Sequence, residues 1–289
     1  MLLAAVSSDI AASRMPHFSG RCFTLKINQN PGRECPEIKP VPAGNERVDE
    51  VNEKIRLIQK TDGLTFGTDA YLLAAFAPVM KNAVAADLGS GTGIIPLLLL
   101  AREKVARIHA FEIQPEFADL IRRNAEENGV ADRLIPHLAD IRDISSRDTG
   151  GALDAVFANP PYRRAGTGIV SSGDAKRMAR HAVMGDIGDF CLAASRLLRS
   201  GGKFFVVFRP DRLADLTVAL RDARLEPKRM TFVHADADAE PSMVLVEARR
   251  DGAPEVRITP PLFLTEKLPG GERPMTARAQ RIYDTCSFD

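Results

Sequence analysis

Apolar segments of strand length alternate with segments of helical periodicity from residue 84 to residue 225, and this alternation is the strongest constraint on the fold. Five expected strands lie at 84–89, 107–113, 133–140, 153–160 and 203–208, and four expected helices at 93–103, 115–129, 189–202 and 212–225. Strands that alternate with helices form a parallel sheet that is covered on both faces. Two further strands, 229–234 and 242–249, have no helix between them and predict an antiparallel edge hairpin. The sequence therefore predicts an α/β fold with a doubly wound, mostly parallel seven-stranded sheet.

The rest of the chain is divided around this core. Residues 1–45 mix Ser, Pro, Gly and charged residues without periodicity, and we expect a poorly ordered extension there. Residues 46–250 form one expected domain, which begins with a small β element and a helix that Pro78 ends. Residues 251–289 are expected to form a C-terminal tail.

Composition and charge exclude several classes of protein. Lys and Arg number 39 against 38 Asp and Glu, so the whole chain, with a net charge of +1, is no polycation that coats nucleic acid or membranes. The longest apolar run, 94–101, is far shorter than the roughly 20 residues that span a bilayer, and no basic segment precedes the apolar residues near the N-terminus. We therefore expect neither a membrane span nor a signal peptide. Four widely spaced cysteines indicate a cytoplasmic protein without a zinc site or a disulfide framework: Cys22, Cys35, Cys191 and Cys286.

The first core strand leads into a glycine-rich turn and then into a helix. We predict that five residues of this turn bind a cofactor: Asp87, Gly89, Ser90, Gly91 and Gly93. Glycines permit positive φ and a close approach of the backbone to a ligand, and a helix N-terminus offers N–H donors. The dinucleotide fingerprint GxGxxG is absent, because Ile94 and Pro96 stand where its third glycine would be. A GxGxG spacing with an acidic residue two positions before it favours S-adenosylmethionine (SAM) over NAD.

The next two strand ends supply carboxylates. Glu112 can accept hydrogen bonds from both ribose hydroxyls of SAM, and Ile113 can face the adenine. Asp140, with Ile141 beside it, can accept from the adenine 6-amino group. Each feature alone has an ordinary explanation as a solvated strand end or a turn residue. Their occurrence on three consecutive strand ends, the edge where open α/β sheets bind ligands, favours SAM.

The fourth strand ends in Asn159, Pro160, Pro161 and Tyr162, which predicts methylation of a planar amine. The lone pair of such a nitrogen is delocalised, and two acceptors on its N–H protons, the Asn159 amide oxygen and the Pro160 carbonyl, aim it at the methyl group. The prolines fix φ and preorganise these acceptors, and Tyr162 can stack on a base that has left its own stack. A proline turn with a buried tyrosine is the ordinary alternative, and the glycine turn three strands earlier counts against it. Planar amides and nucleic-acid bases both remain open as substrates.

The chain resembles the bacterial tRNA1(Val) adenine-N6 methyltransferases over about residues 45–284, in segments that include TDGLTFGTDAYLLAAF, DLGSGTGIIPLLLL, FEIQ, NPPY and DFCLAASRLLRSGGKFFVVFRPDRLADL. The resemblance implies a class I, Rossmann-like methyltransferase fold, SAM as the methyl donor, and the adenine next to the anticodon of a valine tRNA as acceptor. It also implies that Phe66, Thr68 and Asp69 lie over the methionine end of SAM. Ala182 departs from the resemblance, because similar sequences often have Glu there.

A basic segment follows the NPPY motif. Residues 163–181 carry five Lys or Arg against one acid, a local charge of +4, and the basic residues are Arg163, Arg164, Lys176, Arg177 and Arg180. The segment is either a solvated loop or a contact for RNA phosphates, and we favour phosphate contact. tRNA is therefore the expected partner of a protein that we expect to be a monomer.

Three functions remain in view at this point. The first is methylation of adenine N6 in tRNA. The second, within the same chemistry, is methylation of a protein glutamine amide or of a base in rRNA or DNA. The third is a non-catalytic module that binds SAM and RNA, and the intact Asn159, Pro160 and Tyr162 count against it.

Overall fold

The computed structural model describes residues 44–61, 67–161 and 185–288. The chain divides into two compact units, residues 1–38 and 39–289, and every described residue belongs to the second. Its strands are β1 (Glu46–Asn52), β2 (Ile55–Lys60), β3 (Val84–Leu88), β4 (Arg107–Glu112), β5 (Leu134–Leu138), β6 (Leu153–Ala158), β7 (Leu198–Phe208), β8 (Leu225–His234), β9 (Pro241–Arg250), β10 (Arg257–Ile258) and β11 (Leu262–Phe263). Its helices are α1 (Thr68–Phe76), α2 (Ile94–Ala101), α3 (Pro115–Glu127), α5 (Ile187–Leu197), α6 (Leu213–Asp222) and α7 (Ala277–Thr285).

Within the described residues, the main sheet has nine strands in the order β10-β8-β9-β7-β6-β3-β4-β5, with β11 also paired to β8. The strands from β7 to β5 in that order are parallel, and β9 runs antiparallel to both β7 and β8. The predicted mostly parallel α/β sheet and its antiparallel hairpin are therefore confirmed. The short strands β10 and β11 extend the sheet beyond β8 and were not predicted, because runs of two residues carry no periodicity.

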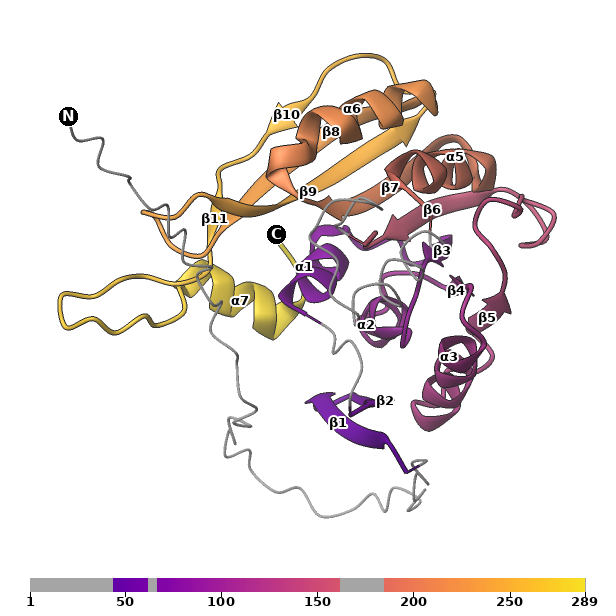
Figure 1. Cartoon of the computed structure of the whole chain (residues 1–289), viewed down its shortest axis with the longest axis horizontal. Helices are drawn as coiled ribbons and strands as arrows, with labels where there is room; N and C mark the ends of the chain where they lie inside the picture. Colours follow the sequence, from indigo (N-terminus) through magenta and orange to yellow (C-terminus); the bar gives the residue numbers. More distant parts are fainter. Residues whose placement is uncertain (1–43, 62–66, 162–184, 289) are drawn as a thin grey trace, which may run out of the picture. The chain divides into compact units, whose positions relative to one another are not determined.

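Helices cover both faces of this sheet (Figure 1). Side chains of β7 alternate between two cores: Phe204 and Val206 pack with α5 and α6, whereas Phe205 and Val207 pack with α1, α2 and α7. This alternation is the period-2 pattern of a pleated strand that is buried on both sides. The helix α2 is apolar all round and buried from Ile94 to Leu100, as expected of a helix within a core.

Local sequence signals set several helix boundaries. Pro115 begins α3, where its missing N–H and its fixed φ suit a first helical turn. Asp186 and Asp189 form a reciprocal capping box at the start of α5. That helix ends at Leu197, earlier than the predicted 202, because Leu198 already pairs with Leu153 of β6 and continues into β7.

The C-terminal residues differ from the expected tail. They carry β10, β11 and α7, and they bury Leu262, Ala279, Ile282 and Cys286 in the core that contains α1 and α2. The ring of Tyr283 stacks on that of Tyr71 in α1, with centroids 4.9 Å apart. The C-terminal segment is thus part of the domain that carries the candidate site.

Candidate active site

The carboxyl ends of β3, β4 and β5 meet at one edge of the sheet and line a small hollow. Its wall consists of Gly89, Phe111, Glu112, Ile113, Asp140, Ile141 and Phe190. Five of these are predicted cofactor residues, so the structure brings them together. The rings of Phe111 and Phe190 were not predicted, because a ring in an apolar strand or helix gives no sign of whether it lines a hollow or fills a core.

The glycine turn crosses this edge with Gly89, Gly91 and Gly93 at φ values of 69°, 56° and 82°. At Gly89 the sign of φ disfavours any side chain, and a Cβ would also lie 3.5 Å from the ring of Phe190. The turn ends at Gly93, which is the N-cap of α2. The N–H groups of Gly89 and Ser90 donate to the Phe111 carbonyl, and that of Gly93 to the Ser90 carbonyl, so the turn is fixed to the end of β4 beside the hollow.

Asp87 lies beneath the turn and is 1% exposed. The hydroxyl of Ser90 donates to its Oδ2 at 2.6 Å, while its buried Oδ1 finds no donor among the described residues. Burial raises the pKa of Asp87 to about 7; the hydrogen bond from Ser90 lowers it, and the nearby Glu112 raises it further. An unpaired buried acceptor fits a ligand that brings a donor or a positive charge, and SAM carries both in its amino and sulfonium groups.

Glu112 is held by three backbone N–H groups. That of Gly91 donates to Oε2, and those of Ile113 and Gln114 donate to Oε1, each at 2.9 Å. The carboxylate therefore ties the end of β4 to the glycine turn. A carboxylate offers about four acceptor positions, so these bonds leave capacity for a ribose hydroxyl.

Asp140 has a close partner that was not predicted. Its carboxylate forms an ion pair with Arg142 and also accepts from the Arg142 backbone N–H at 2.9 Å. The Arg142 guanidinium lowers the pKa of Asp140. Asp140 thus stands at the hollow as a charged acceptor whose direction is set by Arg142.

Asn159 follows β6, which pairs with β3, so it lies at the same edge of the sheet. Its Nδ2 donates to Oδ2 of Asp69 in α1 at 2.9 Å. The next residue, Pro160, is buried, and Pro161 is partly exposed. The structure therefore joins a predicted catalytic amide to a residue predicted at the methionine end of SAM.

The C-terminal helix supports this end of α1. The hydroxyl of Tyr71 donates to the backbone carbonyl of Tyr283 at 2.5 Å. Burial raises the pKa of Tyr283, and a hydrogen bond with the Thr68 side chain opposes that shift. Thr68 and Asp69 are consecutive, so α7 contacts the turn of α1 that holds Asn159. Sequence reasoning included residues 281–284 in the family resemblance but assigned them no role.

Several predicted site residues lie outside the described part of the chain: Phe66, Tyr162, Arg163, Arg164, Lys176, Arg177 and Arg180. Ala182, the departure from the family pattern, lies outside it as well. Within the described ranges no group of three or more His, Cys, Asp or Glu side chains is placed to hold a metal ion. No helix in those ranges is long and apolar enough to cross a membrane.

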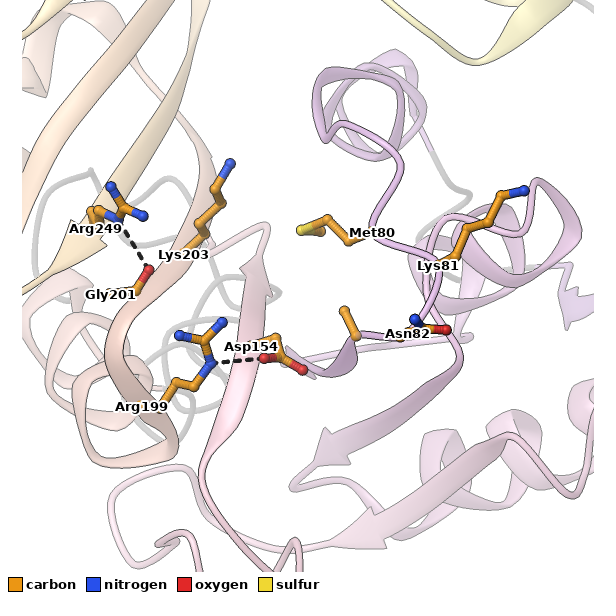
Figure 2. Close-up of a pocket in the computed structure, with 9 residues that line it drawn as sticks. Met80, Lys81, Asn82, Asp154, Arg199, Gly201, Lys203 and Arg249 are labelled. Atoms are coloured by element: carbon orange, nitrogen blue, oxygen red, sulfur yellow. Dashed lines mark hydrogen bonds and ion pairs between the residues drawn. The ribbon is translucent and has the colours of Figure 1, made fainter.

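A second hollow lies at the opposite ends of the strands and has a basic lining (Figure 2). Three of its four basic residues already have partners: Arg199 pairs with Asp154 at 2.8 Å, and Arg249 donates to the Gly201 carbonyl at 3.1 Å. A third, Lys203, pairs with a glutamate of β9 at 3.0 Å. None of the predicted site residues lines it, so it is not the candidate site.

Comparison with known proteins identifies a matching family and similar relatives. The family model of the methyltransferase small domain matches residues 61–221. A tRNA1(Val) (adenine(37)-N6)-methyltransferase of Porphyromonas gingivalis is 32% identical over 191 residues, which cover 63% of this chain and 73% of the relative. A protein of the same description from Phocaeicola vulgatus is 31% identical over 180 residues, covering 62% and 74%.

Solved structures agree on the fold. A predicted O-methyltransferase from Agrobacterium tumefaciens superposes with a TM-score of 0.61 at 23% identity, over 76% of this chain and 97% of the other. Trm5 of Methanocaldococcus jannaschii, in a complex with adenosine, gives a TM-score of 0.51 at 15% identity, over 72% and 56%. At these identities the likeness concerns the arrangement of strands and helices.

Proposed function

This chain belongs to the methyltransferase small domain family, alongside the tRNA1(Val) (adenine(37)-N6)-methyltransferases, and on this basis we propose that it transfers a methyl group from SAM to adenine N6 in tRNA. The acceptor we propose is the adenine next to the anticodon of a valine tRNA, as the names of these relatives suggest. We further propose that the protein acts as a monomer in the cytoplasm.

The observation that supports this proposal most is the position of Asn159. It stands at the carboxyl end of β6, next to β3 and its glycine turn, and its amide NH2 is already bound to Asp69. The amide oxygen is the group that must accept from the substrate amine. The bond to Asp69 leaves that oxygen as the end of the amide that can serve the substrate.

The bound cofactor would supply an electrophilic methyl group, and the residues of the chain would position the cofactor and the target amine. Glu112 and the glycine turn would hold the ribose, Asp140 the adenine, and Asp87 the positively charged end of SAM. The Asn159 oxygen and the Pro160 carbonyl would accept from the two N–H groups of the target amine and direct its lone pair. The amine loses a proton readily after alkylation, so no strong base is required.

RNA as the substrate is supported by the sequence between the motif and α5. Residues 163–181 follow NPPY directly, and their basic side chains would meet the phosphates beside the target base. A protein glutamine substrate needs no such charge. This basic segment and the family membership favour tRNA over a glutamine amide.

The test is methyl transfer to total tRNA with labelled SAM, followed by mapping of the methylated nucleotide. We expect label at adenine N6 beside the anticodon of a valine tRNA. Asn159→Ala should lower kcat by roughly 100–1,000-fold, because it removes one acceptor from the reacting amine. Its affinity for S-adenosylhomocysteine should stay within about threefold of the wild type.

Two results would contradict the proposal. Label in a protein glutamine and none in tRNA would assign the same chemistry to another substrate. Tight binding of SAM and tRNA without transfer would make the chain a non-catalytic module.

A further inference from the structure

We propose that Asp69 is a positioning residue that sets the orientation of the Asn159 amide for methyl transfer. This inference rests on the proposed function, because it concerns the acceptor that Asn159 offers to the target amine. It starts from one contact, the 2.9 Å hydrogen bond from Asn159 Nδ2 to Asp69 Oδ2. The family resemblance places Asp69 at the methionine end of SAM and gives it no part in orienting Asn159.

The chemistry of the two side chains decides which way the amide faces. An amide has a donating NH2 end and an accepting oxygen, and the two orientations have almost the same shape. A carboxylate only accepts, so it binds the NH2 end of Asn159 and turns the oxygen to the other side. The reversed amide would present donors to the N–H groups of the substrate amine, which are donors themselves. Fixing the orientation before substrate arrives therefore favours the productive acceptor.

The structure also holds Asp69 in place. Asp69 lies in the first turn of α1, where the helix dipole favours a negative charge, and its Oδ1 accepts from the Ala70 backbone N–H at 2.9 Å. One carboxylate oxygen is thus bound to the helix and the other to Asn159. Gly67, the N-cap of α1, gives the carboxylate its room, because a Cβ at that position would lie 2.5 Å from Asp69 Oδ1. Any side chain at residue 67 has to displace the carboxylate.

A double-mutant cycle with Asn159 tests the proposal, because a residue that acts through Asn159 has nothing to act on once the amide is removed. We expect Asp69→Ala to lower kcat at saturating SAM by about 10–100-fold. In the Asn159→Ala background, the same substitution should change kcat by less than about twofold. The affinity for S-adenosylhomocysteine, measured by calorimetry, should stay within about threefold of the wild type in Asn159→Ala. Asp69 is expected at the methionine end of SAM, so the kcat of its variants is compared at saturating SAM, where a loss of cofactor affinity does not enter. Multiplicative losses of kcat, or a loss of cofactor affinity with normal kcat at saturation, would overturn the proposal.

A steric variant gives an independent arm that leaves the carboxylate itself intact. Gly67→Ala should displace Asp69 and lower kcat in the same direction, again without further effect once Asn159 is alanine. The matched control is Gly270→Ala, because a Cβ at Gly270 meets nothing within 4 Å. That control should keep wild-type kcat, and thermal unfolding should confirm that both variants are folded. Wild-type turnover in Gly67→Ala would count against the positioning role.

The proposed function can fail while the inference about Asp69 holds. The orientation of the Asn159 amide can then be followed by a measurement that does not depend on turnover. Wild-type protein that leaves tRNA unlabelled would refute the function only. The side-chain NH2 resonances of Asn159 report its bond to a carboxylate directly. They should shift, and their hydrogen exchange should accelerate, in Asp69→Ala but not in Gly270→Ala. Resonances that do not respond to Asp69→Ala would overturn the inference whatever the substrate is.

Discussion

Among single residues, Asp87 has the most unusual electrostatic environment in the site. Its carboxyl is buried, has one unpaired oxygen within the described chain, and has its pKa raised by burial to about 7. The ordinary value is 3.8, so at pH 6 the ligand-free protein holds a proton there that the unfolded chain has lost. A folded-state pKa above the unfolded one gives stability that is fully present below about pH 4. That stability is lost as the pH rises through about 7.

Proton release on SAM binding follows from this environment. A cationic ligand near Asp87 favours the carboxylate, so binding at pH 6 should release close to one proton, and SAM affinity should rise between about pH 5 and pH 7. Calorimetry in two buffers of different ionisation enthalpy measures the release, which should disappear in Asp87→Asn. Binding enthalpies that do not depend on the buffer at pH 6 would place the positive charge of SAM away from Asp87.

The sequence was sufficient to predict that residues at the ends of neighbouring strands would lie together; their role in binding SAM stays a prediction. Gly89, Glu112 and Asp140 stand at one hollow, because parallel strands bring their carboxyl ends to one edge. The bond between Asp69 and Asn159 was missed, since 90 positions separate them and no local pattern records their contact. Arg142 was missed although it is only two positions from Asp140, because a charged residue so close to an aspartate has many ordinary roles.

Among the elements, α1 ends on a contact with a residue outside the helix. Its C-terminal carbonyls are satisfied by a buried lysine: Lys104 donates from Nζ to the carbonyls of Ala74, Ala75 and Ala77. Cations at a helix C-terminus also interact favourably with its dipole. The sequence predicted α1 itself from its apolar residues and Pro78. It could not predict that Lys104, which lies in the loop between α2 and β4, would cap this helix.

Replacing Lys104 should therefore destabilise the domain. Lys104→Met keeps the volume of the side chain but leaves three buried carbonyls without their donor, and we expect a loss of about 2–4 kcal/mol in the free energy of unfolding. Urea denaturation at constant m-value measures it. Lys81→Met is the control, because Lys81 is an exposed lysine whose loss should cost less than about 0.5 kcal/mol. Equal effects of the two substitutions would show that the cap contributes nothing.

For the molecule as a whole, alternation of strands and helices was sufficient to predict the fold class. What it could not predict is the way the C-terminal residues join the sheet and the core. The strands β10 and β11 are too short to show a pattern, and α7 follows a loop without apolar periodicity. Their order comes from packing against β8 and α1, which a local reading of the sequence does not contain.

The charge of the whole molecule leads to a prediction about salt. With 39 basic and 38 acidic residues, attraction of RNA has to be local, and residues 163–181 are the predicted place. Changing Arg163, Arg164, Lys176 and Arg177 to Ser should weaken tRNA binding and leave SAM affinity unchanged. The slope of log affinity against log salt should flatten by roughly 0.7–0.9 for every phosphate that the variant no longer neutralises.

A variant of equal charge change controls for net charge. It replaces Lys81, Arg199, Arg221 and Arg224 with Ser; these residues line two other hollows, neither of which includes the glycine turn. This variant should keep the wild-type slope. A common slope for the two variants would mean that tRNA responds to net charge alone, and would favour the alternative that residues 163–181 are a solvated loop.

The contact between Tyr71 and Tyr283 also has a consequence for how the protein is made. The two residues are 212 positions apart, and ribosomes add about 5–20 residues per second, so α1 waits roughly 10–40 s for α7 to emerge. During that time the part of α1 that contacts α7 lacks its partner, and closing so long a loop carries an entropic cost. The nascent chain therefore carries the first turn of α1, with Thr68 and Asp69, before the helix that braces it exists. The arrangement of Asp69 and Asn159 can therefore be completed only after the C-terminal residues have been synthesised.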